Sequence, residues 1–270
     1  MITDCHVHSR GREKGEDVIK ALDQAGIDRV CLFAPYPGDD ESKQRESTQF
    51  ISKVQAVDPD RIIGFAWIEP KIPSAPDAVS EAVETYGVRG VKMIPHHWYP
   101  YDELLVPVFE RIQAAGVPII FHSGILFGFM DSSRFCRPCG YEALLHFPKI
   151  KFALSHIGWP WTDECIATAG RFRAAIRRGE GPSDMQMHID LCPGTPPPWR
   201  EDALRKAIAY LGDELLIYGS DHGSPDNPEA YLPNLRADQR LFRDVLGLTQ
   251  ASQDRIFGTN VEKLFAGSSS

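Results

Sequence analysis

Two histidines stand at the end of the first strand-like run of the chain, Met1-Ile-Thr-Asp-Cys-His-Val-His8. Side chains alternate between the two faces of a strand, so His6 and His8 emerge on the same face. Neutral imidazole is the commonest side-chain metal ligand near neutral pH. The pair can therefore present two metal ligands from one rigid element, although a His-x-His motif also occurs as a chance surface pair.

Further side chains that can bind a metal or move a proton follow apolar runs farther along the chain. They are Lys92, His122, His156 and Asp221. Each has an ordinary structural explanation as well, because a histidine can be satisfied in the core and an aspartate after a strand can cap the next helix. Whether these residues form one site depends on how the fold arranges the runs that precede them.

Short strand-like runs alternate with longer helix-like segments along the whole chain. The expected strands cover residues 2–8, 29–34, 61–68, 88–94, 117–123, 150–156, 185–192 and 214–221. The expected helices cover residues 16–25, 40–57, 73–86, 102–115, 141–146, 162–178, 200–211, 235–246, 250–257 and 260–266. A strand every 25 to 35 residues or so, each followed by a helix, predicts an α/β fold, the (β/α)8 TIM barrel. A doubly wound open sheet is the alternative, but no glycine-rich phosphate loop follows any of these strands.

The active site of such a barrel lies at the carboxyl ends of its strands. His6 and His8 close the first expected strand, and Lys92 lies near the end of the fourth. The fifth, sixth and eighth strands end at His122, His156 and Asp221. The fold therefore predicts that all six side chains converge on one site.

Composition bounds the class of protein. The chain has 270 residues, 43% of them hydrophobic and 24% charged, with a formal net charge of -8. This indicates a soluble globular protein and argues against nucleic acid or a membrane surface as the main partner. We expect one domain over residues 1–267 and a frayed tail at 268–270. Without an apolar run of membrane-spanning length or a secretion signal, a cytoplasmic location is expected, and homo-oligomer formation stays open.

Motifs spread over nearly the whole chain resemble those of the amidohydrolase superfamily. They are Asp4-Cys-His-Val-His8, Gly90-Val-Lys-Met-Ile-Pro95, Phe121-His-Ser-Gly124, Arg137-Pro138 with Phe147-Pro148, Ser155-His-Ile-Gly158, Gly219-Ser-Asp221 and Ile256-Phe-Gly-Thr-Asn260. More narrowly, the chain is similar to the amidohydrolase-related branch, which contains hydrolases and decarboxylases of the aminocarboxymuconate-semialdehyde type. These motifs are specific for the family and do not select a substrate.

The resemblance implies roles for individual residues. His6, His8, His122 and Asp221 match the metal ligands of the family, and His156 matches a histidine that binds a second metal or contacts substrate and water. Lys92 lies on the strand where binuclear relatives carry a carboxylated, bridging lysine, although a free ammonium that binds a substrate carboxylate is an equal alternative. We expect one ion rather than two.

The chemistry of this set supports the resemblance. Three imidazoles and one carboxylate suit zinc, or manganese and similar ions, and leave a position open for water. A divalent ion lowers the pKa of bound water from about 15.7 towards 7. We expect Asp221 to accept the proton of that water and His156 to stabilise the developing oxyanion or orient the substrate.

Residues in the loops after the strands are candidates for substrate binding. Arg137 is expected to grip a substrate carboxylate with its guanidinium, while His97 and Trp159 are expected to line the pocket. For His97 the alternative is an exposed loop histidine, and for the aromatic residues it is loop packing. Cys136 and Cys139 form a single Cys-x-x-Cys, which we interpret as two reduced thiols.

Three functions fit these observations. The first is a metal-dependent hydrolase of a small carboxylated ester, lactone or amide that uses metal-activated water. The second is a metal-dependent, non-oxidative decarboxylase of a small unsaturated or aromatic acid. The third is a metal-binding protein without catalysis, which is disfavoured because no expected catalytic position is missing.

Overall fold

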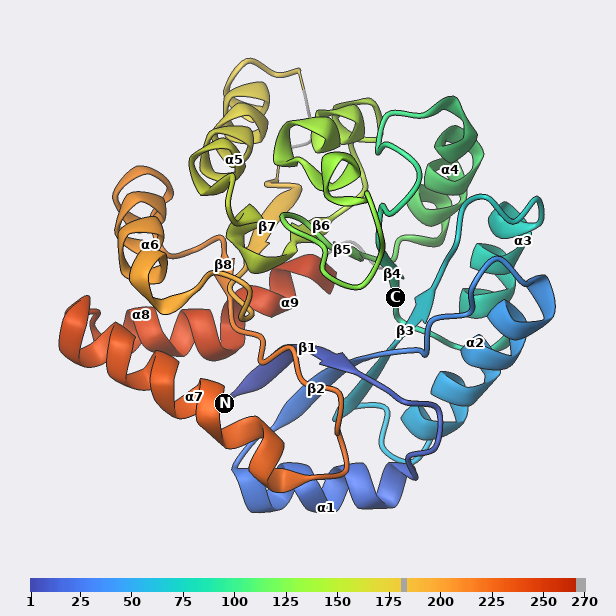
Figure 1. The fold of residues 1–270 in the computed structure, drawn as a ribbon, viewed down its shortest axis with the longest axis horizontal. Coiled ribbons are helices and arrows are strands. Elements are labelled where there is room, and N and C mark those ends of the chain that lie inside the picture. Colours follow the sequence, from blue (N-terminus) through green and yellow to red (C-terminus); the bar gives the residue numbers. More distant parts are fainter. Residues whose placement is uncertain (181–183, 266–270) are drawn as a thin grey trace.

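The computed structural model describes residues 1–180 and 184–265, so the tail expected at 268–270 lies outside the described residues. Eight parallel strands pair in sequence order in one sheet, and helices surround them (Figure 1). The strands are β1 (Thr3–His8), β2 (Arg29–Phe33), β3 (Ile62–Trp67), β4 (Gly90–Met93), β5 (Ile119–Phe121), β6 (Phe152–Leu154), β7 (Met187–Asp190) and β8 (Leu216–Ile217). Each lies within its expected range.

The surrounding helices occupy the segments between strands. They are α1 (Gly15–Ala25), α2 (Glu41–Gln55), α3 (Ala75–Ser80), α4 (Val106–Ala115), α5 (Thr162–Arg177), α6 (Pro197–Leu211), α7 (Pro228–Arg240), α8 (Gln250–Asp254) and α9 (Asn260–Phe265). Short 3₁₀ segments lie at Glu103–Leu105, Ser133–Cys136, Pro138–His146 and Ser155–Gly158, and π-helical turns at Glu81–Thr85, Leu241–Val245 and Arg255–Thr259. No helix in the described part of the chain is long and apolar enough to cross a membrane.

Helix boundaries differ from expectation where capping chemistry was overlooked. The helix expected at 235–246 is the second half of a longer helical segment that begins at Pro228. The side chain of Asn227 accepts a hydrogen bond from the backbone N–H of Glu229 at 3.1 Å. An asparagine cap followed by proline at the first helical position is a strong start signal. The segment expected as a helix at 141–146 is a 3₁₀ segment that already begins at Pro138.

Contacts between β1 and the chain around β8 bring the two ends of the sheet together. The backbone N–H of Cys5 donates to the carbonyl of Tyr218 at 3.0 Å, and that of Asp221 donates to His6 at 2.8 Å. The buried carboxylate of Asp4 also accepts from the backbone N–H of Ser220 at 2.9 Å. The predicted (β/α)8 TIM barrel is therefore confirmed.

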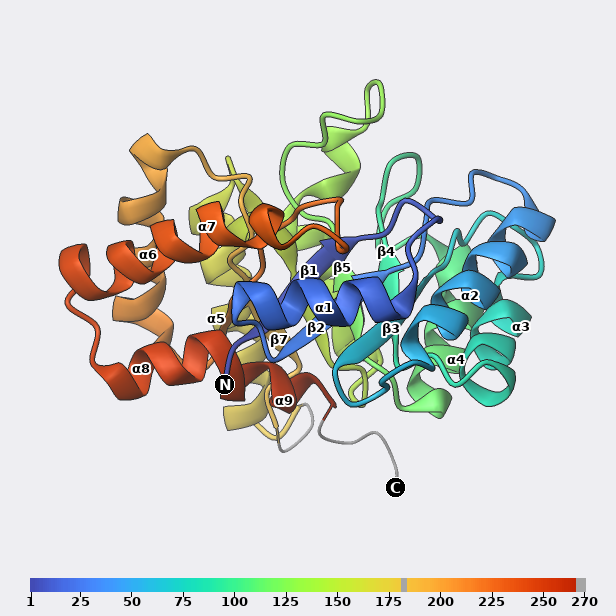
Figure 2. The same cartoon turned by 90° about the horizontal axis from the view of Figure 1, so that it is seen from below.

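Two apolar layers hold the barrel together. One lies between the strands and the outer helices, and the other fills the barrel interior with residues such as Cys31, Phe65 and Ile120. Val261 and Leu264 of α9 join the inner layer, and Figure 2 shows α9 beneath the barrel, at the end where β1 begins. α9 covers this amino end, and the candidate site residues lie at the opposite end, where the strands terminate.

Candidate metal and active site

Three potential ligand atoms form a nearly equilateral triangle at the carboxyl ends of β1 and β8. His6 Nε2 lies 3.2 Å from His8 Nε2 and 3.2 Å from Asp221 Oδ1, and His8 Nε2 lies 3.3 Å from the same oxygen. Two ligands with bonds of about 2.0–2.1 Å to one tetrahedral ion are about 3.3 Å apart. The geometry of these three side chains therefore fits a single divalent cation.

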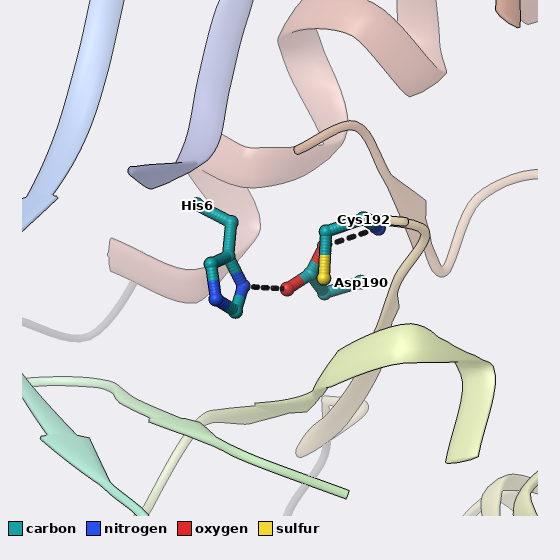
Figure 3. Close-up of side chains that lie close together, drawn as sticks. All are labelled: His6, Asp190 and Cys192. Atoms are coloured by element: carbon teal, nitrogen blue, oxygen red, sulfur yellow. Dashed lines mark hydrogen bonds and ion pairs between the residues drawn. The ribbon is translucent and has the colours of Figure 1, made fainter. Parts of the chain in front are cut away.

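Asp190, at the end of β7, fixes the orientation of His6. Its Oδ2 lies 2.5 Å from His6 Nδ1, and its Oδ1 accepts from the backbone N–H of Cys192 at 2.8 Å (Figure 3). Burial opposes ionisation of Asp190, but His6 and the Cys192 N–H hold its pKa at about 2. An ionised Asp190 keeps the proton of His6 on Nδ1, so that Nε2 offers its lone pair to the triangle.

His122 and His156 face each other beside this triangle. His122 Nδ1 lies 3.2 Å from His156 Nε2. The other ring nitrogen of each lies near a backbone carbonyl, that of Ile125 at 3.1 Å for His122 and that of Pro193 at 2.8 Å for His156. Since a carbonyl can only accept, the protons sit on those nitrogens, and two lone pairs face each other.

This second pair also suits a cation. Burial lowers the pKa of His122 well below its ordinary value and also lowers that of His156, so both rings are neutral at neutral pH. His156 Nδ1 lies 3.9 Å from Asp221 Oδ2, which connects the pair to the triangle. His122 does not join His6, His8 and Asp221 in one group of atoms within 4.8 Å among the described residues. Three of the four expected ligands, His6, His8 and Asp221, thus form the triangle, whereas the fourth, His122, faces His156.

Lys92 of β4 lies inside the barrel against the triangle. The side chain is fully buried, and its Nζ lies 3.4 Å from His6 Nε2 and 4.5 Å from the centre of the Phe33 ring. Burial lowers the pKa of the ammonium, and the carboxylates of Asp190 and Asp221 partly oppose that effect. The amine of Lys92 thus lies next to the position that fits a metal.

Backbone strain marks the ends of β6 and β8. His156, Ile157 and Asp221 have φ angles of 61°, 47° and 55°, in the left-handed region that favours glycine. Such conformations cost about 1–3 kcal/mol each and persist where the surrounding structure enforces them. They turn His156 and Asp221 out of their strands at the site.

The residues expected to bind substrate lie in different surroundings. Trp159 is half-buried, with its ring centre 6.0 Å from that of Trp199, whereas His97 lies beside His96 and Glu69. Arg137 instead forms an ion pair with Glu164, and its guanidinium lies over the Trp161 ring. The structure therefore does not bring Arg137 together with the histidines.

The cysteines of the Cys-x-x-Cys segment are free thiols, as expected. Cys136 is buried and its thiol donates to the carbonyl of Pro95, whereas Cys139 is exposed. A different cysteine, Cys192, was not expected at the site, but its Sγ lies 3.2 Å from His156 Nδ1. Its place at the end of the strand expected at 185–192 was the available signal.

Aromatic residues near His8 were missed as well. The ring centre of Trp67 lies 6.2 Å from that of His8 and 5.0 Å from that of Tyr36. Phe33 packs edge-on against His6 and His8, with ring centres 4.7 and 5.2 Å away. Phe33 and Trp67 end β2 and β3, so the strand-end criterion would have identified them.

Comparison with solved structures finds this fold in proteins of low sequence identity. An uncharacterized TIM-barrel protein from Bordetella bronchiseptica is 17% identical, with a TM-score of 0.70 and 99% of each chain covered. The 2,6-dihydroxybenzoate decarboxylase from Rhizobium is 15% identical, with a TM-score of 0.69, 98% of this chain and 99% of that chain covered. The 5-carboxyvanillate decarboxylase from Novosphingobium aromaticivorans, with bound manganese, is 15% identical, with a TM-score of 0.68, 98% of this chain and 97% of that chain covered.

These structures share the fold with this chain, and the sequence itself identifies the family. No curated protein matches the chain in sequence. A family model described as amidohydrolase matches residues 3–267. The match covers nearly the whole barrel and every motif on which the resemblance rested, so the chain belongs to the amidohydrolase family.

Proposed function

We propose that the chain is a metal-dependent, non-oxidative decarboxylase of a small aromatic or unsaturated acid. The observation that carries this proposal is the triangle of His6, His8 and Asp221 beside the buried Lys92. The triangle suits a divalent cation, and the ammonium provides a positive charge for a substrate carboxylate. One ion at this triangle is proposed; His122, expected as a fourth ligand, would have to move towards the triangle to bind the same ion.

Zinc and manganese both fit a set of imidazole and carboxylate donors, with zinc as our first expectation. When bound, such an ion polarises substrate oxygens and stabilises the charge that develops on them. The structure of the 5-carboxyvanillate decarboxylase, which has a similar fold, contains bound manganese. This supports testing manganese as well as zinc. The oriented Nε2 atom of His6 and the convergence of three ligand atoms are the features of this chain that favour metal binding.

Asp221 is proposed to move the proton. Burial raises the pKa of this carboxyl, but His6 and His8 hold it well below its ordinary value, so the group is ionised at neutral pH. It can accept the proton of a substrate hydroxyl and then deliver it to the carbon that bears the carboxylate. The bond to that carboxylate breaks, its electron pair remains on the carbon that takes the proton, and carbon dioxide leaves.

Other side chains are proposed to position the acid. Lys92 binds its carboxylate, His156 orients it beside Asp221, and Trp159 with Trp199 provides an aromatic wall for a planar ring. Arg137 has to leave Glu164 before it can bind a carboxylate, which makes it the weakest of the expected contacts.

Hydrolysis of a small carboxylated ester, lactone or amide is the second candidate, because the same triangle can activate water. From the sequence alone, hydrolysis is the first expectation. Two of the solved structures with similar folds are decarboxylases, of 2,6-dihydroxybenzoate and of 5-carboxyvanillate. They support decarboxylation more than hydrolysis. Their substrates are aromatic carboxylates, which suit the aromatic residues near His8.

The test compares the two reactions on one preparation. The protein is stripped with a chelator, reloaded with zinc or manganese, and incubated with hydroxylated benzoic acids and with carboxylated lactones and esters. Carbon dioxide release with formation of the decarboxylated ring, lost in Asp221→Asn, is the expected result. Ring opening or ester cleavage without carbon dioxide would establish the hydrolase instead.

A further inference from the structure

A second cluster of metal-binding side chains lies at the ends of β3 and β4. We call Glu69, His96, His97 and Asp39 the rim cluster. Glu69 follows β3, His96 and His97 follow β4, and Glu69 is almost completely buried. Aromatic rings connect this cluster to the triangle: the Trp67 ring packs near those of His8 and Tyr36, and the Tyr36 hydroxyl contacts His96.

Glu69 contacts both histidines with its two oxygens. Its Oε2 lies 3.1 Å from His96 Nε2, and its Oε1 lies 3.3 Å from His97 Nε2. The two Nδ1 atoms of His96 and His97 are in direct contact with each other. Asp39 Oδ1 lies 3.9 Å from His97 Nε2. Three contacts therefore link Glu69, His96 and His97 in a closed ring.

Two neutral histidines do not have enough protons for these three contacts. Each neutral imidazole carries one ring proton. The proton of His96 serves the hydrogen bond to Glu69, and the proton of His97 serves the contact between the Nδ1 atoms. His97 Nε2 is left with a lone pair that faces two carboxylates, and no hydrogen-bond partner for it exists among the described residues.

A nitrogen lone pair that faces two carboxylates is a favourable position for a cation. We propose that His97 Nε2 and Glu69 Oε1 bind a second divalent cation such as zinc at the rim of the barrel, beside the exposed carboxylate of Asp39. The distance of 3.3 Å between the first two atoms matches the separation of about 3.3 Å expected for two ligands on one tetrahedral ion. His96 is a positioning residue, because its two nitrogens hold Glu69 and His97 in place.

Aromatic rings pack around the histidines of the rim cluster. The Phe129 ring stacks on His96 with centres 4.2 Å apart, and Tyr36 packs edge-on against the same imidazole. The exposed carboxylate of Asp39 closes the cluster on the solvent side.

The test is the number of zinc ions that each of five proteins binds. Wild type, His97→Gln, Asp39→Asn, the His6→Ala/His8→Ala double variant and the control His146→Gln are stripped, dialysed against zinc and measured by inductively coupled plasma mass spectrometry. We expect His97→Gln to bind one zinc fewer than wild type. The double variant should retain the rim ion, and His146→Gln, which changes an exposed histidine elsewhere, should bind as many ions as wild type.

This pattern separates the rim ion from the ion of the proposed function, because each variant removes a different one. Equal zinc content in wild type and folded His97→Gln would overturn the rim site, whatever the double variant binds. If His97→Gln does not fold by circular dichroism, Asp39→Asn decides the question. Loss of the Asp39 carboxylate charge beside a divalent cation should raise the dissociation constant of the rim zinc at least about tenfold. An unchanged dissociation constant would overturn the proposal.

Discussion

The Oδ2 atom of Asp190 lies 2.5 Å from Nδ1 of His6, although the two residues are 184 positions apart in the chain. Both side chains are buried, so this contact fixes the imidazole against rotation. Asp190 stands at the end of β7 and His6 near the end of β1, and the barrel brings these strand ends together. The orientation of His6 is therefore a direct product of the fold.

Asp190→Asn should weaken metal binding without removing a ligand. The amide is the same size but no longer stabilises a proton on His6 Nδ1, so Nε2 less often offers its lone pair. We expect metal affinity at the triangle to fall about 10- to 100-fold, as for other residues that orient ligand histidines. Competition with a chromophoric chelator measures this, and Asp184→Asn, at an exposed carboxylate, is the control. An unchanged affinity would show that His6 is not a ligand.

The double variant His6→Ala/His8→Ala should lose the ion at the triangle and all activity. Both imidazoles point to one cation position, and Asp221 by itself offers one ligand atom there. The barrel should still form, because the inner apolar layer does not depend on these side chains. Metal analysis and circular dichroism check the two expectations. Retention of the full wild-type metal content would refute the assignment of these ligands.

Lys92→Met should leave the metal content unchanged and raise KM for carboxylate substrates. The proposed ammonium contact is worth about 1.5–3 kcal/mol, which corresponds to a change of roughly 10- to 100-fold. A carboxylated lysine that bridges two ions would behave differently, because its loss would remove metal. Metal analysis together with steady-state kinetics distinguishes the two forms of Lys92, and a fall in metal content would favour the bridging form.

The sequence predicted the barrel because the alternation of strand-like runs with helix-like segments is repeated along the whole chain. Each strand is a short apolar run, and one misjudged boundary does not change the order of the elements. β8 illustrates the limit: of the expected run 214–221, only Leu216–Ile217 is a strand, and the backbone of Asp221 then turns into the left-handed region. Runs of apolar residues reveal which segments are buried, but they do not show where a strand leaves the sheet.

Contacts between loops were less accessible to sequence reasoning than strand ends. The convergence of His6, His8 and Asp221 follows from their positions at the ends of strands. The pairing of Arg137 with Glu164 depends on how two loops fold back and on side-chain rotamers, which no periodicity encodes. The strand-end rule also applies to Glu69, but its partners became visible only in three dimensions.

His188 of β7 should make the protein less stable in acid. Its side chain is 1% exposed, and neither ring nitrogen has a hydrogen-bond partner among the described residues. Burial lowers its pKa from 6.5 to about 3. Between these values the unfolded chain binds a proton that the folded protein does not, so the free energy of unfolding falls as the pH falls, by about 1.4 kcal/mol per unit.

His188→Leu removes this proton uptake together with two unsatisfied nitrogens. Between pH 7 and pH 5, the wild-type protein should lose about 2 kcal/mol more stability than the variant does. Urea unfolding at both pH values, with the metal removed by chelator, measures the difference. The control is His146→Gln, because that histidine is exposed and its substitution should leave the pH dependence of wild type in place. An identical pH dependence in wild type and His188→Leu would mean that His188 can be protonated in the folded barrel.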